Sequence, residues 1–283
     1  MLQRESGWIG FYAVDKKIDR VVASLYINVT GTKATTAVRS PFGSVECSAG
    51  ISPQTLYDFL TFIDEKLSTS VSEAEIRLSP QAYAPETSAW TFSFLHALGF
   101  TTIVADLSAC IAVGGDYKEA LHKGEQQVLH KALQAGLTAS LISEDQMGNI
   151  YSFIAHHHNK KDYGISMTWP QLNEAISRFP GRYLPFAVHA EGKMVAAAIA
   201  IRVSSRVLSL FYIDHDADYD KLSPPVLLIA TLYDYCVANH VLLLDLGTSS
   251  LPTGPNLSLL SFKMRMGAAP SIKATLRKVY RHG

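Results

Sequence analysis

Residues 242–267 read LLLDLGTSSLPTGPNLSLLSFKMRMG, and this stretch decides the fold that we predict. The apolar run Val241 to Leu244 is too short for a helix and ends in polar residues, which predicts a buried strand that emerges into a loop. A short helix over Leu257 to Met266 follows, with Lys263 and Arg265 among its packed residues. Open sheets bind ligands at such strand ends. We therefore expect a substrate site here.

Charge is uneven along the chain. No acidic residue follows Leu246, and six basic residues do. This local excess favours an anionic partner. The whole chain has 25 basic and 25 acidic residues and a formal net charge of zero. A large nucleic-acid footprint is therefore not expected.

The composition predicts a soluble, cytoplasmic protein. Of its 283 residues, 48% are hydrophobic, so the chain can bury a large core. Its three cysteines, Cys47, Cys110 and Cys236, are isolated and fit reduced thiols better than disulfides or a metal site. No signal peptide is predicted, and no window reaches the roughly 18 apolar residues of a spanning helix.

The order of the predicted elements occurs twice. Each copy has three strands, a helix that starts at a Ser-Pro pair (Ser52-Pro53 or Ser223-Pro224), a strand, a second helix and a last strand. We infer an α/β (α+β) protein of two units, residues 1–112 and 113–283, each a mixed, mostly antiparallel sheet flanked by helices. Convergence on common helix caps is the alternative.

The predicted boundaries are these. The first copy has strands over residues 8–14, 21–28, 35–39, 75–78 and 101–105, and helices over 53–67 and 90–98. The second copy has strands over 184–189, 194–203, 206–214, 241–245 and 271–279, and helices over 224–239 and 257–266. Between them lie a polar helix over 117–136, with a break possible at Gly124, a strand over 137–142, and helices over 144–156 and 171–178.

Three stretches of the chain carry a resemblance to a known family. They are SPFGSVECSAGISPQTLYDFLTFIDEKLSTSVSEAEIRLSP, HKALQAGL, and DLGTS followed by LLSFKMRMGA. With the element order, they resemble the Fem family, the aminoacyl transferases that build peptidoglycan interpeptide bridges, and related GNAT acyltransferases. The resemblance implies two tandem GNAT-like units. It also implies that Asp245 and Gly247 lie at the site wall and that Lys263 is a cation near the transferred carbonyl or the donor's phosphates.

The linking helix departs from the family pattern. Where the family commonly has a run of arginines, this chain has Gln126, Gln127 and His130, with Lys131 the basic residue that remains. This departure counts against recognition of a nucleotide-linked diphosphate.

Acyl transfer to an amine needs a proton acceptor and donors that face the developing oxyanion. Lys263 can supply charge, while Asp245, Tyr212 or His215 could accept the proton. The structural alternatives are that Asp245 caps its turn, that Tyr212 belongs to the core and that Lys263 is a surface cation. The predicted catalytic residues are Lys263, Asp245 and Tyr212, and the predicted substrate-binding residues are Gly247, Thr248, Phe262, Arg265, His215 and Lys131.

The loop DHDADYDKLSP at residues 214–224 bears on the acyl donor. It has no glycine and four aspartates, and Pro224 and Pro225 each lack an N–H. Four carboxylates would repel a pyrophosphate, and a conventional CoA site needs backbone N–H donors at this position. Conventional CoA binding is therefore disfavoured here. Acyl-CoA and aminoacyl-tRNA both stay open as donors, although neutral charge and the missing arginines count against tRNA.

Two possible metal motifs are set aside. Asp214, Asp216 and Asp218 have the first spacings of an EF-hand loop, but the pattern then fails, which favours a solvated loop. The run of histidines at 156–158 cannot converge on one ion, because consecutive helical side chains point about 100 degrees apart.

The first hypothesis is therefore an N-acyltransferase that acts on a small-molecule or peptide amine, with no bound cofactor and acyl-CoA as a possible co-substrate. The alternative is a catalytically degenerate protein that binds a peptide, a glycan precursor or a protein. Acceptor, donor and oligomeric state stay open.

Overall fold

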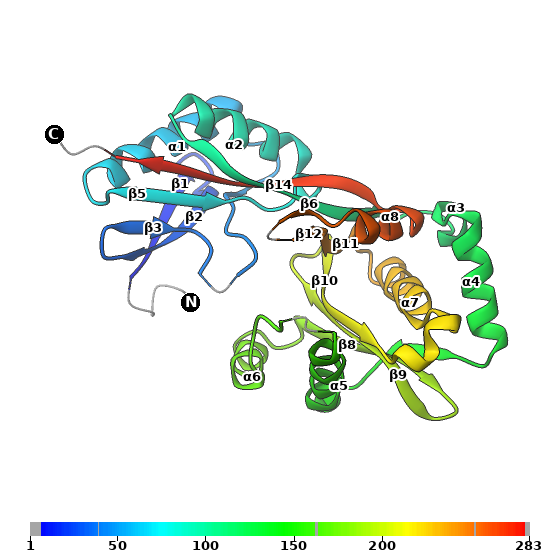
Figure 1. Cartoon of the computed structure of the whole chain (residues 1–283). Coiled ribbons are helices and arrows are strands. Elements are labelled where there is room, and N and C mark those ends of the chain that lie inside the picture. Colours follow the sequence, from blue (N-terminus) through cyan, green and yellow to red (C-terminus); the bar gives the residue numbers. More distant parts are fainter. Residues whose placement is uncertain (1–6, 39, 162–163, 252, 281–283) are drawn as a thin grey trace. The chain divides into compact units, whose positions relative to one another are not determined.

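The computed structural model describes residues 7–38, 40–161, 164–251 and 253–280. The chain forms two compact units, residues 1–107 with 271–283, and residues 108–270 (Figure 1). Our predicted boundary lay after residue 112, with the whole C-terminus in the second unit. The last strand instead lies in the first unit, because it pairs antiparallel with a strand of that unit from Thr275↔Arg77 to Val279↔Glu73.

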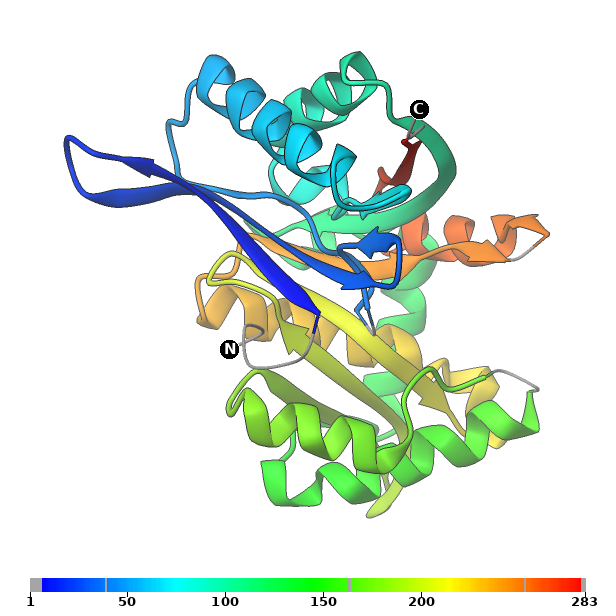
Figure 2. The same ribbon diagram turned by 90° about the vertical axis from the view of Figure 1, so that its left-hand side faces the viewer.

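The first unit is a mixed sheet with two helices, in the order β1-β2-β3-β5-β14-β6 and with β4 beside β2. The long β1–β2 hairpin is dark blue in Figure 2. Its elements are β1 (Trp8–Asp15), β2 (Arg20–Thr30), β3 (Lys33–Thr35), β4 (Glu46–Cys47), α1 (Pro53–Ser68), β5 (Glu73–Arg77), the 3-10 turn η2 (Gln81–Tyr83), α2 (Pro85–Ala97), the start of β6 (Thr101–Ala112) and β14 (Ala269–Val279).

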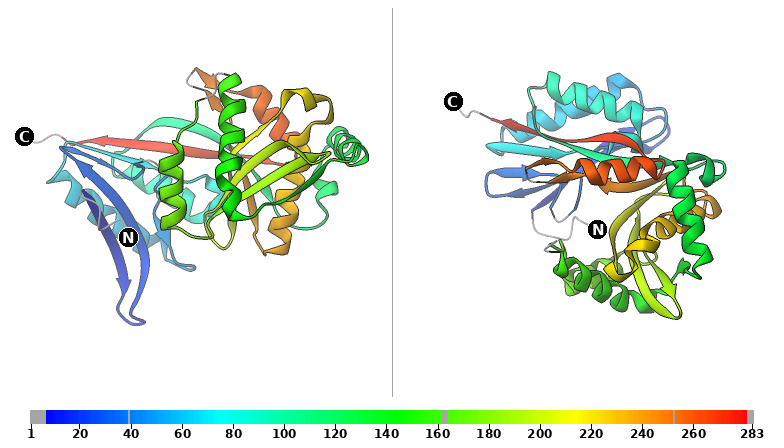
Figure 3. Two further views of the ribbon diagram at one scale, coloured as in Figure 1. Left: turned by 90° about the horizontal axis from the view of Figure 1, so that it is seen from below. Right: turned by 45° about the vertical axis from the view of Figure 1, so that its right-hand side comes forward.

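The second unit has the strand order β6-β11-β10-β9-β8-β7. Helices α5 and α6 lie together on one face of this sheet and α7 lies on the other (Figures 1 and 3). Its elements are α3 (Tyr117–Ala120), α4 (Lys123–Gln134), β7 (Thr138–Leu141), η3 (Glu144–Gln146), α5 (Met147–Lys160), α6 (Trp169–Arg178), β8 (Tyr183–Ala190), β9 (Lys193–Arg202), β10 (Val207–His215), η4 (Ala217–Leu222), α7 (Pro224–Ala238), β11 (Leu243–Thr248), β12 (Ser250–Leu251), β13 (Gly254–Pro255) and α8 (Leu257–Arg265).

The end of β6 pairs antiparallel with β11 in the second unit, and β14 pairs antiparallel with β5 in the first. The α/β class and the mixed, mostly antiparallel sheets are confirmed. That the two units are copies of one ancestral unit stays a prediction.

Local sequence rules explain most helix ends. Helix α1 begins after Ser52, whose hydroxyl accepts from the N–H of Thr55, and its apolar stripe is buried in the core of the first unit. The predicted helix over residues 117–136 is instead divided into α3 and α4. The break comes before Gly124, at Leu121 and His122, where His122 accepts the N–H of Gly124 and so caps α4.

None of the helices in the described part of the chain is long and apolar enough to cross a bilayer. Within those residues, no group of three or more His, Cys, Asp or Glu side chains is arranged to hold a metal ion.

Candidate functional site

Strands β10 and β11 run parallel and then separate. Their register pairs extend from Val207↔Leu243 to Ser209↔Asp245, and the described residues beyond Asp245 make no further pairs between these strands. A bulge lies between Leu210 and Tyr212 in the pairing of β10 with β9. Bulges occur next to active sites, and open sheets bind ligands at the carboxyl ends of their strands. The separation therefore marks the candidate site.

Asp245 lies at the point of separation and is 4% exposed. Its Oδ1 accepts hydrogen bonds from Ser108 Oγ at 2.7 Å and from the backbone N–H of Gly247 at 2.8 Å, with the Cys110 thiol at 3.6 Å. Its Oδ2 accepts from Ser209 Oγ at 3.2 Å. Hydroxyls of β6 and β10 and the backbone of β11 thus meet at one carboxylate, which fixes these three strands together.

Lys263 projects from α8 and is 6% exposed. Its Nζ donates to the carbonyl oxygens of Gly247 at 2.9 Å and Thr248 at 2.8 Å. Burial lowers the pKa of the ammonium to about 8, although the nearby Asp245 carboxylate acts in the opposite direction. The alternative that Lys263 is a surface cation is wrong, because the side chain is buried against the end of β11.

The turn after β11 depends on Gly247, whose φ of +77° is the left-handed region that suits glycine. Ser249 follows, and its hydroxyl is fully buried without a hydrogen-bond partner among the described residues. Buried hydroxyls are nearly always paired, so an orphaned one is a place where a ligand or water binds. Sequence reasoning did not select Ser249 as a site residue, since a serine in a polar turn has no signal that tells a buried hydroxyl from an exposed one.

Tyr212 and His215 lie farther along β10 and are not joined to this group by their hydrogen bonds. The Tyr212 hydroxyl bonds Ser166 Oγ and accepts the N–H of Met167, within the core under α5 and α6. His215 bonds Asp220 through Nε2 at 2.7 Å. At about 3.3 Å per strand residue, the two lie roughly 10 and 20 Å along the strand from Ser209.

Asp214 forms a separate charged cluster at the end of β10. Its carboxylate is 5% exposed and bonds His158 Nδ1 at 2.7 Å and the Lys161 ammonium, both from the end of α5. Burial would raise the pKa of Asp214, but these two hydrogen bonds, the N–H of His215 and the charge of Lys161 together outweigh burial and bring the pKa to about 2. The interpretation of this loop as solvated is therefore wrong at Asp214, which is buried and paired.

Two other aspartates of the loop also bond basic side chains. Asp216 bonds Lys193 Nζ at 2.9 Å, and Asp220 bonds His215. The expected repulsion of a pyrophosphate by four free carboxylates is therefore weaker than the sequence suggested.

The N-terminus of α7 lacks backbone donors all the same. Ser223 adopts φ 44° and ψ 60° and makes no side-chain cap, so the predicted serine cap is wrong here. Pro224 and Pro225 have no N–H, and the N–H of Val226 is used by the Ser223 carbonyl at 2.9 Å. This helix start does not offer the row of free N–H groups with which other helices hold phosphate.

The remaining predicted residues have structural partners. Arg265 Nε donates to Glu125 Oε1 at 2.7 Å, and its guanidinium lies 5.9 Å from the ring of Phe262, which packs against the core. Lys131 Nζ donates to the Lys221 carbonyl at 3.0 Å. The structure thus brings together Lys263, Asp245, Gly247 and Thr248. It places Arg265 and Phe262 on α8 and Lys131 on α4, each in separate contacts.

Comparison with known families now adds to this geometry. Residues 126–253 match the family model described as an acetyltransferase (GNAT) domain. The second unit has the GNAT fold. The matched range contains β7 to β11, and with them the separation of β10 from β11 and the Asp245 end of the site.

Solved structures with the same fold match nearly the whole chain. FemX matches with a TM-score of 0.71 and 11% identity over 97% of this chain and 89% of FemX. L-PGS from Bacillus licheniformis matches with a TM-score of 0.60 and 12% identity over 99% of this chain and 90% of that one. A tandem GNAT protein from the clavulanic acid biosynthesis pathway matches with a TM-score of 0.54 and 12% identity over 98% of this chain and 85% of that one. At these identities the likeness concerns the fold, and it confirms the resemblance to Fem and GNAT proteins at that level.

No curated protein matches the sequence.

Proposed function

We propose that this protein is an N-acyltransferase that transfers an acyl or aminoacyl group from an activated donor to an amine. The observation that carries the proposal is the buried Asp245 and Lys263 group at the separation of β10 and β11, in a unit with the GNAT fold. The alternative of a binding protein without chemistry is not favoured, because the matched family model is one of acetyltransferases.

The reaction needs little covalent chemistry from the protein. The amine attacks the acyl carbonyl, a C–N bond forms, the bond to the leaving group breaks, and the amine proton ends on the leaving group. The protein must orient both reactants and stabilise the charge that develops on the carbonyl oxygen. A buried cation at a strand end supplies that stabilisation more strongly than it would in water.

We assign the cationic role to Lys263 and a positioning role to Asp245. Four donors already bond the two carboxylate oxygens of Asp245, and they fix the turn on which the Lys263 ammonium rests. The unpartnered hydroxyl of Ser249 is a third group for the substrate to bond. Tyr212 as a catalytic residue, and His215, Phe262, Arg265 and Lys131 as binding residues, stay predictions that this geometry does not favour.

The class of acyl donor is the second part of the proposal. The proline pair at the start of α7 argues against a pyrophosphate held there, so an aminoacyl donor, or acyl-CoA bound in another way, fits better than conventional CoA binding. The amine acceptor is a small molecule or a peptide.

Two measurements test the proposal. The first is the thermal midpoint with and without millimolar acetyl-CoA, since a ligand that binds only the folded state raises it. The second is transfer of radiolabelled acyl groups from acyl-CoA and of amino acids from charged tRNA to a panel of amines. Transfer that Lys263→Ala abolishes supports the proposal. Transfer at the full rate in Lys263→Ala contradicts the residue assignment, and no transfer from either donor contradicts the function.

A further inference from the structure

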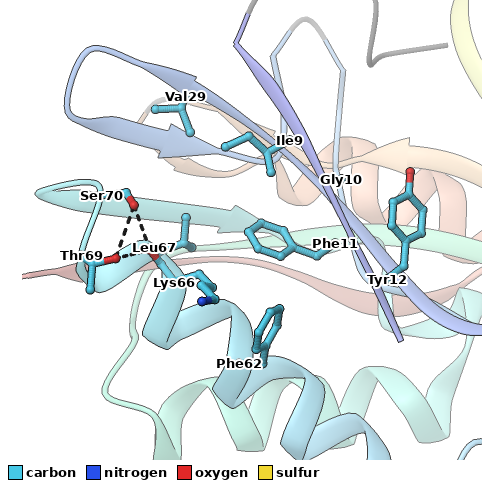
Figure 4. A pocket seen from close by; sticks show the side chains of 10 residues that line it. All are labelled: Ile9, Gly10, Phe11, Tyr12, Val29, Phe62, Lys66, Leu67, Thr69 and Ser70. Carbon is cyan, nitrogen blue, oxygen red and sulfur yellow. Dashed lines mark hydrogen bonds between the residues drawn. The ribbon is translucent and has the colours of Figure 1, made fainter. Parts of the chain in front are cut away.

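A groove of about 440 Å³ lies between strand β1 and the C-terminal turn of helix α1, within the first unit (Figure 4). Residues 9–12 of β1 line one side, and Phe62, Lys66 and Leu67 of α1 line the other. Val29 of β2, with Thr69 and Ser70 after α1, completes the lining, so the groove lies between the α1-facing side of the β1–β2 hairpin and the end of α1.

Strand β1 is the terminal strand of its sheet, with β2 on one side and, in the described part of the chain, no strand on the other. An edge strand presents N–H and C=O groups to any further strand. Natural edges are usually shielded by charged residues or proline. From Trp8 to Val14 this edge has neither.

The walls of the groove are apolar and partly open to solvent. Phe11 lies edge-on to Phe62 with ring centroids 6.3 Å apart, and Ile9 and Phe62 are 45% and 47% exposed. Covering such side chains is favourable. Among the described residues that line the groove, Lys66 is the ionic one and none is a carboxylate; its Nζ lies 5.4 Å from the centre of the Phe62 ring.

We propose that this groove binds an extended peptide of a partner molecule, which adds a strand to the edge of β1. Its apolar side chains, at alternate positions, pack against the exposed surfaces of Ile9 and Phe62, and a carboxylate of the peptide meets the Lys66 ammonium. Strand addition beside a helix is a recurring mode of peptide recognition, in which main-chain bonds give affinity and side-chain pockets give specificity.

Other occupants satisfy fewer of these features. An aliphatic chain would fill the apolar groove and leave the strand edge unpaired. A second copy of β1 would bring Lys16 and Lys17, which follow it directly, to a groove whose own ionic group is already a cation.

The experiment uses the whole chain and an array of fluorescein-labelled hexapeptides in which Val, Leu, Ile or Phe alternates with Thr. Each peptide is made with a C-terminal carboxylate and with an amide. We expect carboxylate peptides to bind about tenfold more tightly than their amides, as one charged hydrogen bond predicts. Hydrogen exchange should show protection of β1 amides in the complex.

Variants separate the groove from the rest of the unit. Phe62→Lys should abolish binding, and Lys66→Ala should remove the preference for the carboxylate while weaker binding persists. Phe92→Lys is the matched control, because Phe92 is an exposed aromatic residue on α2 that does not line the groove, and it should bind as the wild type does.

Three results would overturn the proposal. One is that no peptide of the array binds. Another is that binding leaves the β1 amides unprotected or is the same in Phe62→Lys. The third is reversible self-association in sedimentation equilibrium that Phe62→Lys abolishes, which would assign the groove to a second copy of the chain.

Discussion

Two buried aspartates of the second unit lie on neighbouring strands in different surroundings. Asp214 on β10 bonds two side chains that can carry positive charge, His158 and Lys161. Asp245 on β11 bonds hydroxyls, a thiol and a backbone N–H, while Lys263 nearby bonds backbone carbonyls instead of a carboxylate. The first arrangement neutralises its own charge and fastens α5 to the sheet. The second leaves a buried ammonium without a direct carboxylate bond, which is the arrangement that suits transition-state stabilisation.

The largest effect on the free energy of unfolding is expected at Asp245. Asp245→Ala leaves the Gly247 N–H and the hydroxyls of Ser108 and Ser209 without their acceptor, which should lower the free energy of unfolding by about 4 kcal/mol. Urea denaturation measures the loss. Asp245→Asn keeps an acceptor oxygen and should lose about half as much. Equal losses in the two variants would show that hydrogen bonding does not explain the role of this residue.

Asp214→Ala should lower the free energy of unfolding by about 3 kcal/mol, because it removes the buried carboxylate that bonds His158, the partly exposed Lys161 ammonium and the N–H of His215. Since the folded pKa of Asp214 is about 2, the stabilisation is present above the unfolded pKa near 3.8 and is lost as the pH falls through about 2. The difference between wild type and variant should therefore shrink in acid. Asp218→Ala, in the same loop, is the control and should change stability by less than about 0.5 kcal/mol. A similar loss in both variants would contradict the ion-pair account.

Lys263→Ala should lower kcat/KM for acyl transfer about 100-fold, as loss of one oxyanion donor does in other enzymes. Arg265→Ala is the matched control, since Arg265 lies on the same helix and is paired with Glu125, and it should lose less than about tenfold. If the Arg265 variant lost more activity than the Lys263 variant, the assignment of the cationic role to Lys263 would be contradicted.

The pKa of Lys263 predicts a pH effect on stability. An unfolded lysine titrates near pH 10.5 and folded Lys263 at about 8, so between these values the unfolded chain binds more protons and stability rises with pH. Lys263→Met lacks this titration. The stability of wild type relative to Lys263→Met should therefore increase from pH 8 to pH 10 in urea denaturation. A constant difference over this range would mean that the ammonium is not destabilised by burial.

The smallest effect is expected at Ser249. Ser249→Ala removes a buried hydroxyl that bonds none of the described residues, so stability should stay the same or rise by up to about 1 kcal/mol, while transfer should fall roughly tenfold or less. Thermal unfolding and steady-state kinetics measure the two effects. A clear loss of stability would show that the hydroxyl has a structural partner and is not reserved for a ligand.

The same dipeptide shows how far local rules extend. Ser52-Pro53 and Ser223-Pro224 both start a helix, as the sequence predicted. Ser52 is extended and caps α1 through its hydroxyl, whereas Ser223 is left-handed and bonds the carbonyl of Asp220 instead. The 3-10 turn η4 before Ser223 sets that conformation, and a propensity for caps cannot reveal it.

The sequence by itself determined the strand that ends at Asp245, the turn at Gly247 and the short helix that carries Lys263, because apolar run length, glycine and helical spacing are local signals. It also supplied the resemblance that the fold confirms. The strand predicted over residues 101–105 was too short. It left out the part of β6 that belongs to the second unit and supplies Ser108 and Cys110.

Only the tertiary structure decided the hydrogen-bond partners of Asp245 and Asp214. Ser108 and Ser209 are 137 and 36 residues from Asp245, and His158 is 56 residues from Asp214. The pairing of such distant residues depends on strand register and on which strand completes which sheet. Burial then follows from packing, and burial is what lowers the pKa of Lys263 and what leaves the Ser249 hydroxyl without a partner.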